Sequence, residues 1–262
     1  MTEAAPPEAT DLILAFADDE ICMAHWYATW IGLGPFLEED LALTSIGQDE
    51  LGHARALYGL LDPAGVPAPS NTGSSPLDRL AFGRPPEGYR SAWLVEQPCA
   101  LWEDLFVRHV LYDEAETIRW EALVGSAVVD LAAVATRALA EEVFHRRRAR
   151  AVLEPLRAGS AVAEERISAA VQRWLPQAVA LFEPVASEAA ALASGVVTVG
   201  TPDQAAEFRR RVESLFGGLP REGGWPSLPA EPQGRAGRRS AAFAAMFEEM
   251  NRVFSLDPAA RW

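Results

Sequence analysis

Two of the four histidines in this 262-residue sequence stand three positions after a glutamate, as Glu50-x-x-His53 and Glu142-x-x-His145. Residues at positions i and i+3 lie on one face of an α-helix about one turn apart. The carboxylate and the imidazole of each pair can therefore reach the same metal ion, and both are ligands that first-row transition metals accept. The two motifs together indicate a metal site built from carboxylates and imidazoles.

Apolar residues surround these acids at helical spacing, and Ile46, for example, stands four positions before Glu50. A buried carboxylate is costly unless it is paired, protonated or bound to a metal ion. Glu20 stands in a similar apolar stripe, and so does a third acid, which is either Asp113 or its neighbour Glu114. Both of these neighbours lie within one helical turn of the required level.

The acids and the motifs form a repeat, because Glu20 precedes Glu50 by 30 residues and Asp113 precedes Glu142 by 29. Each acid and its motif flank a predicted turn, so an antiparallel hairpin brings them to the same height. One acid from each of two helices plus Glu-x-x-His from the other two is the ligand set of a carboxylate-bridged di-metal bundle. The predicted metal ligands are Glu20, Glu50, His53, Asp113, Glu142 and His145, with Glu114 as the alternative to Asp113.

Apolar residues follow the helical period along most of the chain, and β alternation bounded by hairpin turns is absent. The pattern predicts an all-α, ferritin-like four-helix bundle with additional C-terminal helices. It forms one domain over residues 1–262, with a core at about 10–159 and an extension at about 160–262. Thr10 is the expected N-cap of the first helix, and Pro176 and Pro184 are expected to kink the fifth long helix. The helices are expected at about 10–31, 36–61, 77–82, 98–125, 128–159, 161–192, 203–216 and 240–254.

The composition excludes several classes of protein. With 49% hydrophobic residues the chain is neither disordered nor a disulfide scaffold, and its 37 acids against 23 bases give a net charge of −14 that disfavours nucleic acids. No apolar stretch approaches the roughly 20 residues of a membrane span, and the first ten residues do not resemble a signal peptide. Cys22 and Cys99 form no metal-binding or disulfide pattern. We therefore expect a cytoplasmic protein that binds neither nucleic acid nor membrane.

Three observations leave alternatives open. The basic residues at 146–150 are expected to form a solvated face that pairs with acids, or else a site for the phosphates of a bulky anionic substrate or for an acidic partner. His25 and His109 match no ligand spacing and are expected to be ordinary side chains. The buried acids themselves could form a hydrogen-bonded network that contains no metal.

The motifs resemble those of a known family, the ferritin-like subunits of bacterial ring 1,2-phenylacetyl-CoA epoxidase, a multicomponent monooxygenase of phenylacetate breakdown. Residues 48–53 and 141–145 are similar to the metal-binding helices of its catalytic subunit. Other stretches are more similar to the structural, non-catalytic subunit, which usually lacks the Glu-x-x-His pairs. These stretches are residues 37–43, 46–47, 94–98, 131–139, 181–183 and 246–262.

The resemblance implies a di-iron oxygenase component that binds two iron ions and acts in the epoxidation of the aromatic ring of phenylacetyl-CoA. It also implies a separate reductase as electron donor, a CoA thioester as substrate, and a hetero-oligomer with another ferritin-like subunit or a homodimer. Glu50 and Glu142 would be the bridging ligands. Two other functions remain: a metal-free structural partner subunit of the same complex, and a stand-alone ferritin-like di-iron protein.

Overall fold

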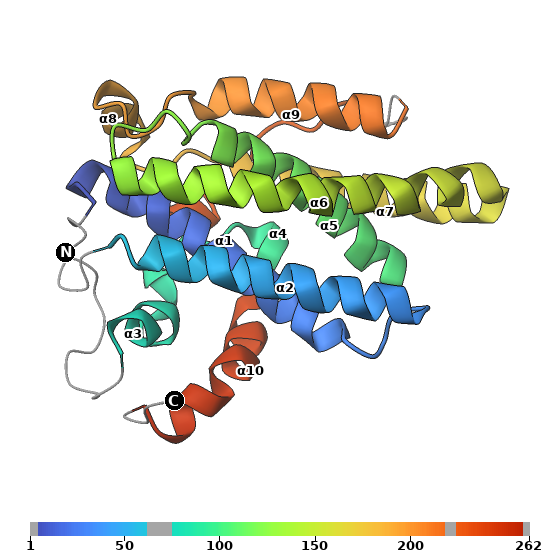
Figure 1. Ribbon diagram of the computed structural model, residues 1–262, viewed down its shortest axis with the longest axis horizontal. Helices are drawn as coiled ribbons and strands as arrows, with labels where there is room; N and C mark the ends of the chain where they lie inside the picture. The colour runs from blue at the N-terminus through green and yellow to red at the C-terminus, as the bar shows by residue number, and fades with distance from the viewer. Residues whose placement is uncertain (1–4, 62–74, 218–223, 259–262) are drawn as a thin grey trace. The chain divides into compact units, whose positions relative to one another are not determined.

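The computed structural model describes residues 5–61, 75–217 and 224–258, and these residues form helices and no strand (Figure 1). The predicted all-α, ferritin-like fold class is confirmed. The chain divides into two compact units. Unit 1 takes in the chain up to Pro98, Val185–Ala191 and the chain from Pro232 onward, and unit 2 takes in Cys99–Pro184 and Leu192–Glu231. The prediction of a single domain stays a prediction.

Two long helices, α1 (Pro7–Trp30) and α2 (Leu37–Tyr58), form the predicted antiparallel hairpin of unit 1 (Figure 1). They approach closely at Gly47, where an added Cβ atom would lie 3.2 Å from the Cβ atom of Tyr27. The expected N-cap at Thr10 is wrong. Helix α1 begins three residues earlier, because the proline that opens it already has the backbone conformation of a first helical turn and needs no N–H partner there.

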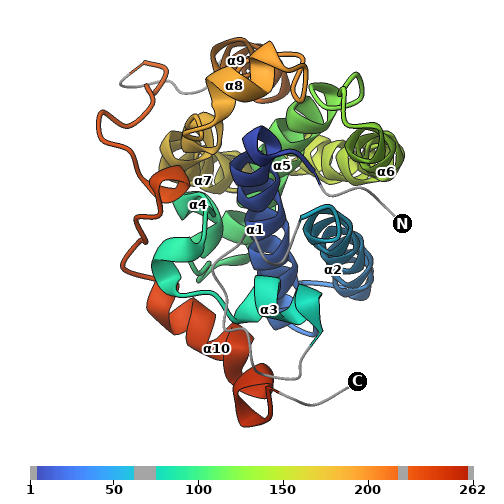
Figure 2. The same cartoon turned by 90° about the vertical axis from the view of Figure 1, so that its left-hand side faces the viewer.

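Short helices complete unit 1. Helix α10 lies beside α3, where the Asn251 side chain donates a hydrogen bond to the carbonyl oxygen of Phe82 at 2.9 Å and the rings of Phe82 and Phe254 are 5.7 Å apart (Figure 2). Helix α4 was not predicted, since four residues give too short a pattern to recognise. The short helices are α3 (Pro76–Phe82), η1 (Pro86–Gly88), α4 (Trp93–Glu96), η3 (Gly234–Ala236) and α10 (Phe243–Leu256).

A buried arginine joins the C-terminal part of unit 1 to helix α1. The Arg235 guanidinium donates to both carboxylate oxygens of Asp19, at 2.9 and 2.7 Å. The backbone before it passes so close to Ser91 that a Cβ atom on Gly234 would lie 2.0 Å from the Ser91 carbonyl oxygen. Only glycine fits this position, so the path that brings Arg235 to α1 depends on the glycine before it.

Two more buried ion pairs stabilise unit 1. Asp18 accepts hydrogen bonds from the Arg84 guanidinium and, at 2.6 Å, from the Tyr58 hydroxyl. Glu96 pairs with Arg239 at 2.6 Å. Burial raises the pKa of Glu96, and Arg239 opposes that rise. Each of these carboxylates therefore has a cation that offsets the cost of burying it.

Unit 2 is organised around α5 (Trp102–Glu121), which packs against α6 (Val129–Gly159), α7 (Ala161–Val179) and α9 (Thr201–Leu215) (Figure 1). The bounds of α6 agree with the prediction. Helix α5 begins four residues later than expected. In the described part of the chain, no helix combines the length and the apolar character that crossing a membrane would require.

The expected long helix over 161–192 is wrong. Helix α7 ends at Val179 and is followed by one turn of 3-10 helix, η2 (Ala180–Phe182), and by α8 (Glu188–Ala193). Pro176 is accommodated inside α7, whereas Pro184 stands in the break. A proline disfavours helical backbone in the residue before it, so the chain leaves the helix there instead of bending.

Candidate metal centre

Unit 1 contains a cluster of three predicted ligands, Glu20 of α1 and Glu50 and His53 of α2, which we call the α1–α2 cluster. All three side chains are at most 1% exposed. The Nδ1 atom of His53 lies 3.4 Å from a carboxylate oxygen of Glu20 and 3.5 Å from one of Glu50. One potential ligand atom from each residue lies within 4.8 Å of the others. The hairpin therefore brings the acid of α1 to the Glu-x-x-His motif of α2, as predicted.

The donor set of the α1–α2 cluster fits a transition metal ion. It combines two carboxylates with one imidazole, ligands that suit iron and its neighbours. Two buried carboxylates face one histidine, so even a protonated His53 would offset only one of the two negative charges. A divalent cation held by Glu20 and Glu50 would offset both and leave His53 neutral, as metal ligation requires.

Unit 2 contains a second group, Asp113 and Glu116 of α5 and Glu142 and His145 of α6, which we call the α5–α6 cluster. The four side chains are at most 4% exposed. Asp113, Glu116 and Glu142 each bring an oxygen atom within 4.8 Å of the other two, and the Nδ1 atom of His145 lies 3.1 Å from Glu142. Three predicted ligands therefore meet, together with one carboxylate that was not predicted.

The electrostatics of the α5–α6 cluster favour a bound cation. Burial raises the pKa of Asp113 well above its usual range, and the carboxylates of Glu116 and Glu114 raise it further. The interactions of Asp113 with His145 and Arg148 act in the opposite direction and lower this pKa. A metal ion among these oxygens would favour the ionised carboxylate, so the donor set of this cluster also fits a metal.

The two alternatives for the third-helix acid have different surroundings. Whereas Asp113 lies in the α5–α6 cluster, the buried side chain of Glu114 pairs with Arg146 at 3.0 Å and with Arg150 at 3.4 Å. Successive residues of a helix point about 100° apart, which separates the two carboxylates into different environments. Asp113 is therefore the candidate ligand, and Glu114 belongs to an ion-pair network.

Two residues of this region were not among the predicted ligands. Glu116 was overlooked because no histidine accompanies it, although it follows Asp113 by three positions and is fully buried. Its carboxylate accepts a hydrogen bond from the indole of Trp120 at 2.8 Å. His109, expected to be an ordinary side chain, is buried with its Nδ1 atom 2.9 Å from Asp113. The spacing of four residues between His109 and Asp113 could have indicated this contact, because residues at i and i+4 lie on one face of a helix.

The structure groups Glu20, Glu50 and His53 in unit 1, and it groups Asp113, Glu142 and His145 with Glu116 in unit 2. Their role as metal ligands and their combination into a single dinuclear centre stay predictions. His25, the other histidine expected to be an ordinary side chain, belongs to neither cluster. Its Nε2 atom lies 3.9 Å from a carboxylate oxygen of Glu249 in α10, within unit 1.

Comparison with known proteins gives the chain a family. Residues 1–262 match the family described as phenylacetic acid catabolic protein. A subunit of the 1,2-phenylacetyl-CoA epoxidase of Escherichia coli (strain K12) is 30% identical over 176 residues, which cover 67% of this chain and 68% of that protein. The resemblance seen around the two Glu-x-x-His motifs is thus confirmed over the full length, and the chain belongs to the phenylacetic acid catabolic protein family.

Proposed function

We propose that this chain is a subunit of a di-iron multicomponent monooxygenase that acts in phenylacetate breakdown. Membership of the phenylacetic acid catabolic family and the similarity to an epoxidase subunit support the role in phenylacetate breakdown. The observation that carries the iron-dependent part is the pair of buried clusters, each of which combines carboxylates with the histidine of a Glu-x-x-His motif.

Each cluster would hold one of the two iron ions. Glu20, Glu50 and His53 would bind the first, and the second would be bound by Asp113, Glu142 and His145. Four carboxylates offset the charge of two divalent ions, and Glu50 and Glu142 are the proposed bridging ligands. When bound, the iron would supply the activation of O₂ for oxygen insertion into the aromatic ring of phenylacetyl-CoA, with electrons from a reductase.

The protein contributes a dry and positioned set of ligands. Glu50 and His53 are held on consecutive turns of α2, where Ile46 and Ala54 are also buried. Burial of these neighbours excludes water from the α1–α2 cluster and strengthens its electrostatic interactions. Glu116, held by Trp120, adds a carboxylate that can accept a proton or hydrogen bond beside the ligands of the α5–α6 cluster.

The similarity to a subunit of an epoxidase also suggests that this chain has protein partners. A subunit of a multi-subunit epoxidase works in a complex, so we propose that this chain assembles with another ferritin-like subunit and serves a CoA thioester substrate. A homodimer is the alternative assembly. Both cysteines, Cys22 and Cys99, are free thiols, which supports a reducing, cytoplasmic location.

Iron analysis after anaerobic reconstitution tests the proposal. We expect about two iron ions per chain and the spectrum of an oxidised iron centre. Glu142→Ala should lower the iron content strongly, because it removes a ligand that both ions would share. Glu154→Ala, also on α6 but exposed, is the matched control and should keep the iron. Wild-type protein that binds well under one iron per chain would contradict the proposal.

A second candidate function is a metal-free structural subunit of the same complex. It is favoured by the close contacts of His53 with Glu20 and Glu50, because a protonated histidine can hold these carboxylates without metal. Addition of Fe²⁺ separates the two functions. A ligand that binds only the folded state raises the unfolding temperature, so a metal protein should be stabilised and a metal-free scaffold should not.

A further inference from the structure

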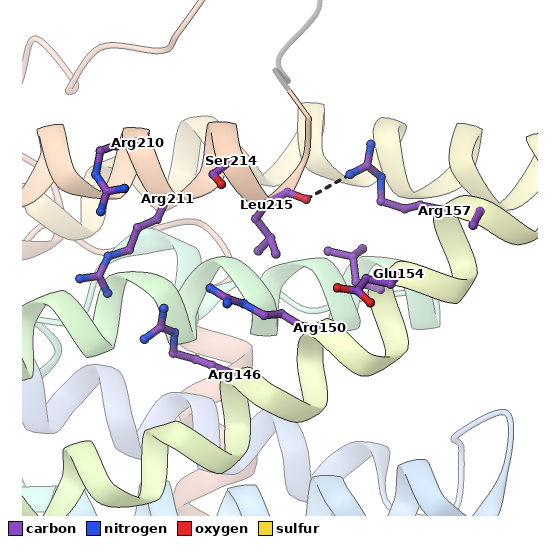
Figure 3. A pocket seen from close by; sticks show the side chains of 10 residues that line it. Arg146, Arg150, Glu154, Arg157, Arg210, Arg211, Ser214 and Leu215 are labelled. Carbon is purple, nitrogen blue, oxygen red and sulfur yellow. Dashed lines mark hydrogen bonds between the residues drawn. The ribbon is translucent and has the colours of Figure 1, made fainter.

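A pocket rich in arginine lies in unit 2 between the C-terminal half of α6 and helix α9 (Figure 3). Its volume is about 760 Å³. Three of its arginines come from α6 and two from α9, and Glu154 is the acidic residue that lines it. Figure 3 shows the side chains of Arg146 and Arg150 rising from α6 and those of Arg210 and Arg211 reaching toward them from α9. The five lining arginines are Arg146, Arg150, Arg157, Arg210 and Arg211.

Such a concentration of positive charge is unusual in this chain. The protein carries a net charge of −14 and has 23 basic residues, of which five line one pocket. Like charges repel one another, so gathering five guanidiniums around a hollow disfavours folding unless an anion or nearby acids compensate it. Among the residues that line the pocket, five are arginines and one, Glu154, is an acid.

Acids behind the pocket hold the arginines in place. The buried carboxylate of Glu114 contacts three guanidiniums, those of Arg146 at 3.0 Å, Arg150 at 3.4 Å and Arg211 at 3.9 Å. One carboxylate therefore serves three cations. A guanidinium has five N–H donors and a carboxylate accepts two of them in a bidentate pair, so donors remain for a ligand.

Arg157, Arg210 and Arg211 are also positioned by carboxylates. The Arg157 guanidinium donates to both carboxylate oxygens of Glu164, at 2.9 and 3.2 Å, and to the carbonyl oxygen of Leu215. Glu207 accepts hydrogen bonds from Arg210 and Arg211, which lower its pKa to about 2. The lowered pKa keeps the Glu207 carboxylate ionised at neutral pH. Together with the Glu164 contacts, it orients the guanidiniums before any ligand arrives, so binding costs less entropy.

The dimensions of the pocket indicate a ligand with more than one phosphate. Arg146 and Arg157 are eleven positions apart on α6, which corresponds to about 16 Å along the helix axis. A single phosphate contacts only one end of such a row. Leu153 and Leu215 add an apolar part to the lining, which can contact an organic group but not a phosphate.

We propose that the pocket between α6 and α9 binds a small organic molecule that carries two or more phosphate groups. Arg150 and Arg210, with side chains 51% and 70% exposed, would contact the phosphates from opposite helices. The apolar residues Leu153 and Leu215 would contact the organic part. No residue of the α1–α2 cluster or the α5–α6 cluster lines the pocket, so this proposal does not depend on metal binding by either cluster.

Isothermal titration calorimetry of the full chain at low ionic strength tests the site with four probes. We expect ADP to bind more tightly than pyrophosphate, because its organic part contacts the apolar lining. Pyrophosphate should bind at least about tenfold more tightly than inorganic phosphate, because its second phosphate accepts further charge-assisted hydrogen bonds. A hexaglutamate peptide, which mimics an acidic partner protein, should bind more weakly than ADP. Added salt should weaken all binding to the pocket.

Two variants locate the binding. Arg150→Ala and Arg210→Ala should each weaken ADP at least about tenfold, since each loses a charged contact. Arg209→Ala is the matched control, because Arg209 is an exposed arginine of α9 that pairs with Glu213 and lies outside the lining. It should leave the affinity within a factor of about two. Unchanged thermal unfolding shows that the variants are folded, as expected for exposed side chains.

Four results would overturn the proposal. They are undetectable ADP binding to the wild type, equal affinity for phosphate and pyrophosphate, ADP binding no tighter than pyrophosphate, and loss of binding in Arg209→Ala to the same extent as in the pocket variants. Tighter binding of hexaglutamate than of ADP would assign the pocket to an acidic protein partner instead. Failure of iron binding leaves every one of these measurements unaffected.

Discussion

Helix α1 carries three consecutive acids, Asp18, Asp19 and Glu20, and all three are fully buried. Asp18 and Asp19 are held by the guanidiniums of Arg84 and Arg235. Glu20 instead faces His53 and a second carboxylate. Burial alone therefore does not distinguish a structural acid from a candidate metal ligand.

Helix α5 of unit 2 also carries one acid held by arginines and one acid grouped with a histidine, and the two are neighbours in the sequence. Glu114 contacts arginines, whereas Asp113 lies among the carboxylates and the histidine of the α5–α6 cluster. An arginine is permanently charged and has no lone pair to offer a metal, so an acid that it holds is already compensated. A histidine can lose its proton and bind a metal, so acids grouped around it form a site that a cation can occupy. The chemistry of the partner is what separates the two kinds of buried acid.

Removal of an arginine partner should have the largest effect on stability. Arg235→Ala leaves the fully buried Asp19 without the bidentate partner that offsets its charge, and we expect a loss of about 3–5 kcal/mol in the free energy of unfolding. Urea denaturation of the metal-free protein measures this. The iron content per folded chain should stay that of the wild type. A loss below about 1 kcal/mol would place this pair with ordinary surface ion pairs.

Exchange of the neighbouring acids of α5 should separate metal binding from ion pairing. Asp113→Asn should weaken iron binding by at least about tenfold, since the amide is a poorer ligand than a carboxylate. Glu114→Gln should keep the iron, because Glu114 contacts arginines instead. Competition with a chelator gives both affinities. Equal iron binding by the two variants would remove the distinction between these neighbours.

Neutralising an acid in a cluster should have a smaller effect of opposite sign. Glu20→Gln in the metal-free protein removes one of two neighbouring buried negative charges, and we expect a gain of about 1 kcal/mol in stability. Asp19→Asn, one residue earlier, should instead destabilise the protein by leaving Arg235 buried without its carboxylate. Urea denaturation of both variants checks the sign. Two losses of similar size would show that Glu20 is an ordinary structural acid.

The buried thiol beside the ion pairs should show the smallest response. Cys22 is fully buried and its pKa is raised well above the usual value by burial, with the neighbouring carboxylates Glu96, Asp18 and Asp19 acting in the same direction. Iodoacetamide should therefore leave Cys22 unmodified in the folded protein and modify it after unfolding in urea. Mass spectrometry of tryptic peptides reports this. Rapid modification of the native protein would show that this part of unit 1 opens readily.

Local spacing was enough to predict much of the fold and of the site. The i, i+3 motifs and the short turns placed Glu20 with Glu50 and His53, because both depend on residues close in sequence. The bounds of α6 were also predicted from the local helical pattern. The basic residues at 146–150 were expected to pair with acids or else to bind phosphates or an acidic partner, and Arg146 does contact the acid Glu114.

Other features depend on contacts that spacing does not reveal. Arg235 and Asp19 are 216 residues apart in the sequence, so no local pattern connects them. The arginine pocket joins two helices whose register is set by packing, and only its α6 residues formed a visible run. Helix α7 ends at Val179 where the apolar pattern continues, because the chain changes direction before Pro184.

The path of the chain through the two units also sets an order for its folding during synthesis. Unit 2 occupies Cys99–Pro184 and Leu192–Glu231, so it is translated before the last stretch of unit 1 that carries Arg235. At about 5–20 residues per second, roughly ten to forty seconds pass between the synthesis of Asp19 and that of Arg235. The ion pair that compensates Asp19 can therefore form only after nearly the whole chain has been made.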